Sequence, residues 1–127
     1  MTLAFANQQY PTDFDIPLDG TEHDVLATIG IDAVESDRGM ATNGARVFRA
    51  AIDATKETTD YYVVVYGKVT PDGGWGIIYT PGAIVTHGTV FQLTPINVTG
   101  LFAVRMTVRM LAGIGNELFT VEGSMAS

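Results

Sequence analysis

The stretch YYVVVYGKVTPDGGWGIIYT, residues 61–80, decides the fold class of the chain. Its first nine residues are dense in aromatic and β-branched side chains, which favour strands. Pro71 then sets up a turn, and Gly73 and Gly74 supply residues that tolerate positive φ. Because a strand-like pattern resumes at Trp75, the stretch predicts a β-hairpin.

A second strand is predicted by LFAVRMTVRML, residues 101–111, where apolar residues alternate with a mixed face. The mixed face carries Arg105 and Arg109, which strand rise places about 13 Å apart. At that separation the two arginines line a flat surface and do not grip one small anion. Two interpretations stay open: a solvent face, or a face that meets the acidic N-terminal segment, folded back or donated by a neighbouring chain.

Turn signals divide the rest of the chain into further short strands. They are expected at residues 13–18, 25–34, 45–52, 83–93 and 117–123. The helix-compatible stretch 45–52 is assigned as a strand because its flanks lack capping residues. The pattern predicts an all-β protein, an antiparallel two-sheet sandwich, jelly-roll-like, with seven or eight strands.

With 127 residues, the chain has the length of one domain. We expect a single β-sandwich domain over residues 13–127, preceded by an extended N-terminal arm over residues 1–12. The arm shows no clear period and is expected to become ordered only against something else. Pro17 removes a ladder donor, so the strand at 13–18 is predicted to lie at a sheet edge, where another chain can complete it.

The composition narrows the environment of the chain. Charged residues make up 17% of it, below the roughly 25% of an average domain, which indicates either a surface covered by a partner or outer faces rich in small residues. The absence of Cys excludes disulfides and thiolate metal sites. With neither a signal-peptide pattern nor an apolar run of membrane length, the sequence predicts a cytoplasmic protein with no membrane partner.

The net charge of −7 is unevenly distributed. Residues 1–37 hold eight acidic and no basic residues, whereas residues 38–127 hold seven basic and six acidic ones. Phosphate would be repelled by the first segment and would find few basic residues in the second, so we expect no nucleic-acid partner. The acidic segment fits a basic protein surface, a cation, or simply solvent.

No catalytic constellation stands out, and we predict that the protein is not an enzyme and needs no cofactor. None of the serines lies in a nucleophile-elbow context, and the two histidines, His23 and His87, are far apart in sequence. No metal ligand set is assigned. Calcium at the N-terminal acids stays an open alternative, although their spacing is not that of an EF-hand loop.

One alternative function is carbohydrate binding. Trp75 and Tyr79 lie on the predicted hairpin together with further tyrosines, and such rings stack on sugar faces. A cross-strand packing cluster explains the same residues.

The arm MTLAFANQQYPTDFD, residues 1–15, the strand succession over residues 61–111 and the lack of catalytic residues together resemble the decoration, or cement, proteins of tailed bacteriophage heads. The resemblance implies a structural protein on the capsid surface of the virion. It further implies a homotrimer that binds the major capsid protein or another virion protein and stabilises the shell.

Eight residues are the predicted partner contacts. From the arm and the edge strand we expect Phe5, Tyr10, Phe14 and Ile16 to dock on the partner. Arg46, Arg49, Arg105 and Arg109 are expected to pair with acids between chains.

Overall fold

The structure, a computed structural model, describes residues 5–26 and 39–127, with residues 5–7 described by their backbone alone. The described residues form strands and no helix. The strands are β1 (Phe5–Pro17), β2 (Glu22–Asp24), β3 (Met40–Ala41), β4 (Val47–Asp53), β5 (Tyr61–Lys68), β6 (Gly76–Tyr79), β7 (Val90–Gln92), β8 (Ile96–Asn97), β9 (Ala103–Met110) and β10 (Asn116–Ala126). The described part of the chain therefore has no helix that is long and apolar enough to cross a bilayer.

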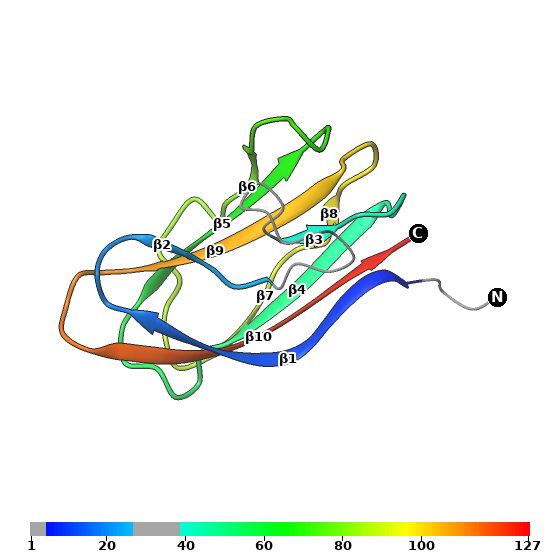
Figure 1. The fold of residues 1–127 in the computed structure, drawn as a ribbon. Helices are drawn as coiled ribbons and strands as arrows, with labels where there is room; N and C mark the ends of the chain where they lie inside the picture. The colour runs from blue at the N-terminus through cyan, green and yellow to red at the C-terminus, as the bar shows by residue number, and fades with distance from the viewer. Residues whose placement is uncertain (1–4, 27–38) are drawn as a thin grey trace.

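The strands form two five-stranded antiparallel sheets that face each other (Figure 1). One sheet has the order β1-β10-β4-β7, with β8 also paired to β4. The other has the order β2-β9-β5-β6, with β3 also paired to β9. The predicted all-β, antiparallel two-sheet sandwich is confirmed, while a jelly-roll connectivity stays a prediction.

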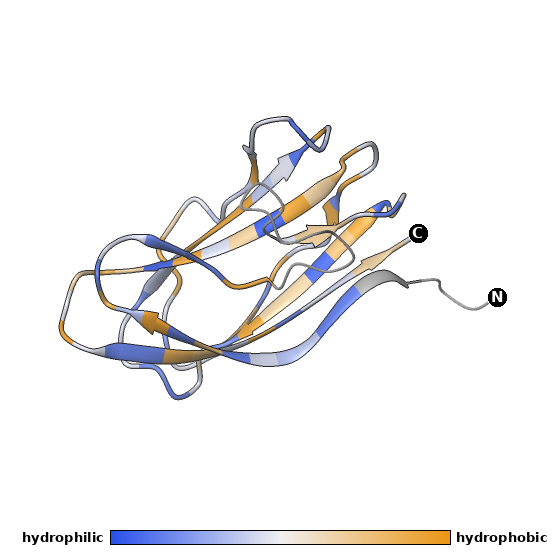
Figure 2. Ribbon diagram, viewed as in Figure 1, coloured by the Kyte–Doolittle hydropathy of each residue, from blue (hydrophilic) through white to orange (hydrophobic). Residues whose placement is uncertain are grey.

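Alternation along the strands places the core between the sheets. Val104, Met106 and Val108 of β9 are fully buried, and they meet residues such as Phe48 and Phe119 of the opposite sheet in one cluster. Figure 2 shows hydrophobic segments along β4 and β9, whereas β1 is mostly hydrophilic. The face of β9 that was predicted to be apolar is thus the one that packs inward.

The hairpin predicted over residues 61–80 is present as β5 and β6. The strand predicted over 45–52 is β4, and the one predicted over 101–111 contains β9. The single strand predicted over residues 83–93 is not present as such. Only Val90–Gln92 form a strand there, and Val85 makes an isolated bridge to Tyr61. A turn containing Gly88, at φ 85°, separates these two contacts.

The strand count also differs from the prediction of seven or eight. The described residues form ten strands, because β2, β3, β7 and β8 are each only two or three residues long and too short to show an alternating pattern. Most of the strand predicted at 25–34 lies outside the described residues.

Residues 5–12 do not form a separate arm. They belong to β1, which pairs with β10 from Phe5 opposite Ala126 to Pro17 opposite Asn116. The prediction of an arm failed because the pairing joins the two ends of the chain: Asp13 and Thr120, joined by a side-chain hydrogen bond, are 107 residues apart. Local periodicity carries no signal of such a distant partner.

Gly39 allows the chain to approach β9 closely just before β3. Its φ is +101°, a conformation that favours glycine, and a Cβ at this position would lie 2.2 Å from the Val104 carbonyl oxygen. The glycine therefore determines where β3 can join its sheet.

Candidate functional site

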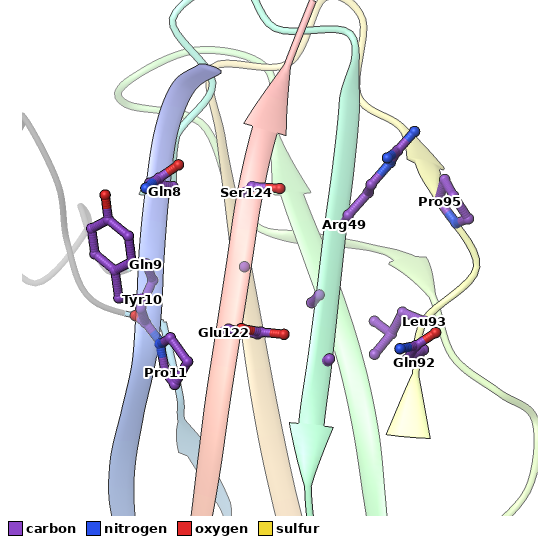
Figure 3. A pocket seen from close by; sticks show the side chains of 13 residues that line it. Gln8, Gln9, Tyr10, Pro11, Arg49, Gln92, Leu93, Pro95, Glu122 and Ser124 are labelled. Atoms are coloured by element: carbon purple, nitrogen blue, oxygen red, sulfur yellow. The ribbon is translucent and has the colours of Figure 1, made fainter. Parts of the chain in front are cut away.

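A β-bulge shapes the edge of β1 that faces away from β10. Between Gln9 and Thr12 the register with β10 shifts, so that Tyr10 and Pro11 together lie opposite a single residue of β10. Tyr10 is 74% exposed, and its ring lies on the side of β1 that faces away from β10 (Figure 3). Among the described strands, β10 is the only one hydrogen-bonded to β1. This edge therefore presents an aromatic side chain beside backbone that pairs with no other described strand.

Gln9 fixes the start of the bulge from the inside. Its side chain is buried, and the Nε2 amide donates to the carbonyl oxygens of Val25, at 3.1 Å, and of Val121, at 3.2 Å. These bonds tie β1 both to its neighbour β10 and to the segment that follows β2. The position of Tyr10 is thus set by a buried anchor one residue away.

Next to the bulge, the outer face of the sheet is hollowed into an open groove of about 550 Å³ (Figure 3). Residues 8–11 of β1 form one side, and residues 92, 93 and 95 form the other. Ala51 of β4 lies between them. Because its side chain is a single methyl group, the middle of the sheet surface is low at this position.

Polar side chains line the groove in two cross-strand rows. In the first row, Gln8, Ser124 and Arg49 are consecutive partners on β1, β10 and β4. In the second row, Glu122 lies opposite Ala51, which lies opposite Gln92 of β7. Two residues of strand separate the rows, about 7 Å. Arg49 and Glu122 are therefore diagonal neighbours on one face.

Within the described residues, these polar side chains have no hydrogen-bonding partners. No hydrogen bond or ion pair joins Gln8, Arg49, Gln92, Glu122 or Ser124 to another described residue. Other polar side chains of the same sheet do form pairs, as in Thr120–Asp13 and Asn116–Asp15. Among the described residues, the groove therefore contains five polar side chains that are available to a ligand.

The Arg105 face is covered by the acidic segment of the same chain. Arg105 pairs with Asp24 of β2, and its guanidinium lies 5.3 Å from the ring centroid of Tyr66. Arg109 lies 4.2 Å from the ring centroid of Tyr62. The acid expected opposite Arg105 on another chain is therefore supplied from within, because β2 folds back onto β9.

The N-terminal acids are dispersed. Asp13 accepts a hydrogen bond from Thr120, Asp15 from Asn116, and Glu22 from Tyr66 and Thr107. The described residues include no group of three or more His, Asp or Glu side chains arranged to hold a metal ion. These acids therefore act separately along β1 and β2, each with its own partner.

Both histidines contact carboxylates near the surface. His23 lies 2.9 Å from Asp19, and His87 lies 2.6 Å from Asp60. Hydrogen bonds from His87 lower the pKa of Asp60, and those from His23 and Thr21 lower the pKa of Asp19 to about 2. Neither histidine lines the groove.

Trp75 and Tyr79 do not form an open platform. The Lys68 ammonium lies 4.8 Å from the Trp75 ring centroid and 5.7 Å from that of Phe102, and it donates to the Pro71 carbonyl at 3.2 Å. Trp75 is half-buried in this arrangement, and Tyr79 packs against the core. The indole therefore covers a buried lysine.

The other predicted contact residues divide between core and surface. Ile16 is 2% exposed and belongs to the core, and Phe14 packs against it, so neither forms an open docking surface. The strand alternation that places these two residues inward could not be assigned without the register of β1. Arg46 and Arg49 are exposed, and Phe5 begins β1.

A carboxyl pair at the end of the sandwich was not predicted. Burial, together with the neighbouring Glu117 carboxylate, raises the pKa of Glu57 from 4.5 to about 7. Burial opposes ionisation of Glu117 as well, but hydrogen bonds from Thr58 and Thr59 lower its pKa. The two residues are 60 positions apart, and neither has a sequence motif around it.

Comparison with known proteins gave no match: no family model fits the chain, and neither the curated proteins nor the solved structures contained a significantly similar one.

Proposed function

We propose that this chain is a non-enzymatic structural protein that attaches to a larger protein shell as a decoration protein of a bacteriophage head. The observation that carries the proposal is the free edge of β1, a 13-residue strand that is hydrogen-bonded on one side among the described strands and exposes Tyr10 at its bulge. Exposed strand edges bind other chains by strand addition, and tyrosine is enriched in protein interfaces.

The edge favours one specific partner over open-ended association. The bulge and Pro11 interrupt the row of backbone donors, which leaves residues 12–16 as the longest regular stretch. Asp13 and Asp15 add negative charge to this stretch and disfavour pairing with a second copy of the same edge. A shell subunit with a basic strand fits this edge, because it can pair with the regular stretch at residues 12–16 and complement its negative charge.

Arg46 and Arg49 complete the proposed contact set. Arg49 lies on β4 of the sheet that carries β1, and Arg46 immediately precedes that strand. Both are exposed, and neither has an ion-pair partner among the described residues. We propose that they meet acids of the shell or of a neighbouring copy in a closed homo-oligomer, with a trimer as the expected state. Light scattering of the purified protein measures that state directly.

Particle binding tests the proposal. The purified chain is added to virus particles that lack it, and the bound fraction is measured by sedimentation for wild type, Tyr10→Ser and Ile77→Ser. Ile77 is a suitable control because it is 64% exposed on a strand of the other sheet. We expect wild type and Ile77→Ser to bind and Tyr10→Ser to bind much more weakly. Equal binding by all three excludes the β1 edge, and no binding by any of them excludes a decoration role.

A further inference from the structure

The groove beside β1 contains polar side chains, Gln8, Gln92 and Glu122, that the proposed attachment does not use, and it shares Arg49 with the proposed attachment surface. It lies on the face of the sheet, where the backbone of β10 and β4 is already paired and only side chains are available to a ligand. Its volume, about 550 Å³, is in the range of small-ligand sites. A ligand there would be recognised by the side chains of the two polar rows.

The charges in the groove indicate a neutral ligand. Arg49 and Glu122 are diagonal neighbours across β4 and β10, so an anion would meet the Glu122 carboxylate and a cation would meet the Arg49 guanidinium. The net charge of −7 further disfavours anions. A neutral ligand that both donates and accepts hydrogen bonds would satisfy the two groups at once.

Hydroxyl groups have this property. A hydroxyl donates one hydrogen bond and accepts others, so two adjacent hydroxyls can donate to Glu122 while accepting from Arg49. Gln8 and Gln92, at opposite sides of the groove, each offer an amide that donates and accepts. Charged partners make such hydrogen bonds stronger than neutral ones. The two rows, about 7 Å apart, present these groups on the scale of adjacent sugar rings.

We propose that this groove binds a neutral saccharide, with Glu122 and Arg49 holding adjacent hydroxyls and Gln8 and Gln92 contacting its two ends. This site is distinct from the Trp75 and Tyr79 platform, where the Lys68 ammonium lies over the indole.

Amide-resolved NMR titration of the isolated chain tests the proposal. The probes are neutral trisaccharides built from glucose, galactose, mannose or N-acetylglucosamine, each raised to its solubility limit. We expect at least one probe to shift the amides of residues 8–11, 49–51 and 122–124. Glu122→Gln and Arg49→Gln should each lower the affinity for that probe by roughly ten- to a hundredfold, which is the effect of losing hydrogen bonds to a charged group. Asp72→Asn, in an exposed turn, is the matched control and should bind as wild type does.

Each outcome of the titration either supports or overturns saccharide binding in the groove. Shifts confined to the groove and weakened by both groove variants support the site. Shifts centred on Trp75, binding that both variants leave unchanged, or no shift with any probe overturns it. Because the titration contains no virus particles, its result is independent of the attachment proposed for the edge of β1.

Discussion

The guanidinium of Arg105 on β9 forms an ion pair with the carboxylate of Asp24 on β2, within one chain. Strand β2 is only three residues long, and its backbone pairing with β9 is correspondingly brief. Glu22, at the other end of β2, accepts hydrogen bonds from Tyr66 and Thr107. Side chains therefore hold this short strand on the sheet as much as its backbone does.

Removing the Asp24 charge should loosen β2. Both partners of the ion pair are partly exposed, so we expect Asp24→Asn to lower the free energy of unfolding by about 1 kcal/mol. A double-mutant cycle with Arg105→Gln, measured by urea unfolding, isolates the pair from other contacts of Asp24. A coupling energy of zero in that cycle would show that the pair does not stabilise the fold.

Because the pKa of Glu57 is raised, the free energy of unfolding should fall as the pH rises from about 4.5 to about 7. Its pKa is about 7 in the folded protein and near the ordinary 4.5 when unfolded, so between these values the unfolded state ionises first. The contribution of Glu57 is therefore fully present below about pH 4.5 and declines by roughly 1.4 kcal/mol per pH unit up to about pH 7.

Glu57→Gln provides the measurement, because it removes the ionisation and keeps the shape. The free energy of unfolding of wild type and variant is measured with urea at several pH values. Between about pH 4.5 and pH 7, the value for the variant should rise relative to that of wild type. Carboxylates whose pKa is lowered, such as Asp60, change the free energy of unfolding in the opposite direction. Their contribution is the same in wild type and variant, so it cancels when the two free energies are subtracted. A difference that does not change with pH contradicts the assignment of Glu57.

Trp75 is expected to contribute to stability. Its ring covers the ammonium of Lys68, a residue only 1% exposed, so Trp75→Ala should cost roughly 2 kcal/mol of unfolding free energy. Trp75→Phe retains an aromatic face and should recover part of that loss. The free energies of unfolding of Trp75→Ala and Trp75→Phe are measured with guanidinium chloride and compared. An unchanged stability in Trp75→Ala, accompanied by loss of saccharide binding, would instead indicate a sugar platform at this ring.

Gln9 and Gln8 form a matched pair for testing how β1 is anchored. Gln9→Ala removes two buried hydrogen bonds and should lower the free energy of unfolding by about 2 kcal/mol, with faster amide exchange in residues 8–13. Gln8→Ala, on the groove face, should stay within about 0.5 kcal/mol of wild type. For the same reason, removing residues 1–12 should destabilise the sandwich. Equal stability of the two variants would show that the anchor is unimportant.

What the sequence predicts well is what depends on neighbouring residues. Alternation over 61–80 and 101–111 was sufficient to assign the hairpin and the buried face of β9. Turn chemistry at Pro71 and the following glycines placed the connection correctly. Each of these features follows from local backbone preferences and side-chain period.

The features that were missed depend on residues far apart in the chain. Tyr10 was expected to contact a partner, but the bulge at which it lies is defined only by register with β10. Ile16 was assigned to a partner although it faces the core, since its inward orientation follows from the same register. The groove combines side chains from β1, β4, β7 and β10, and Glu57 meets Glu117 across 60 positions. No local pattern encodes such encounters.

The pairing of β1 with β10 also determines the order in which this protein can be assembled during synthesis. The ribosome makes β1 about one hundred residues before its partner β10, as the 107-residue separation of Asp13 and Thr120 shows. The nascent chain must carry this hydrophilic strand without its partner for that whole interval. A fold closed by so distant a contact is expected to form slowly, on the millisecond-to-second scale, and only after β10 has left the exit tunnel.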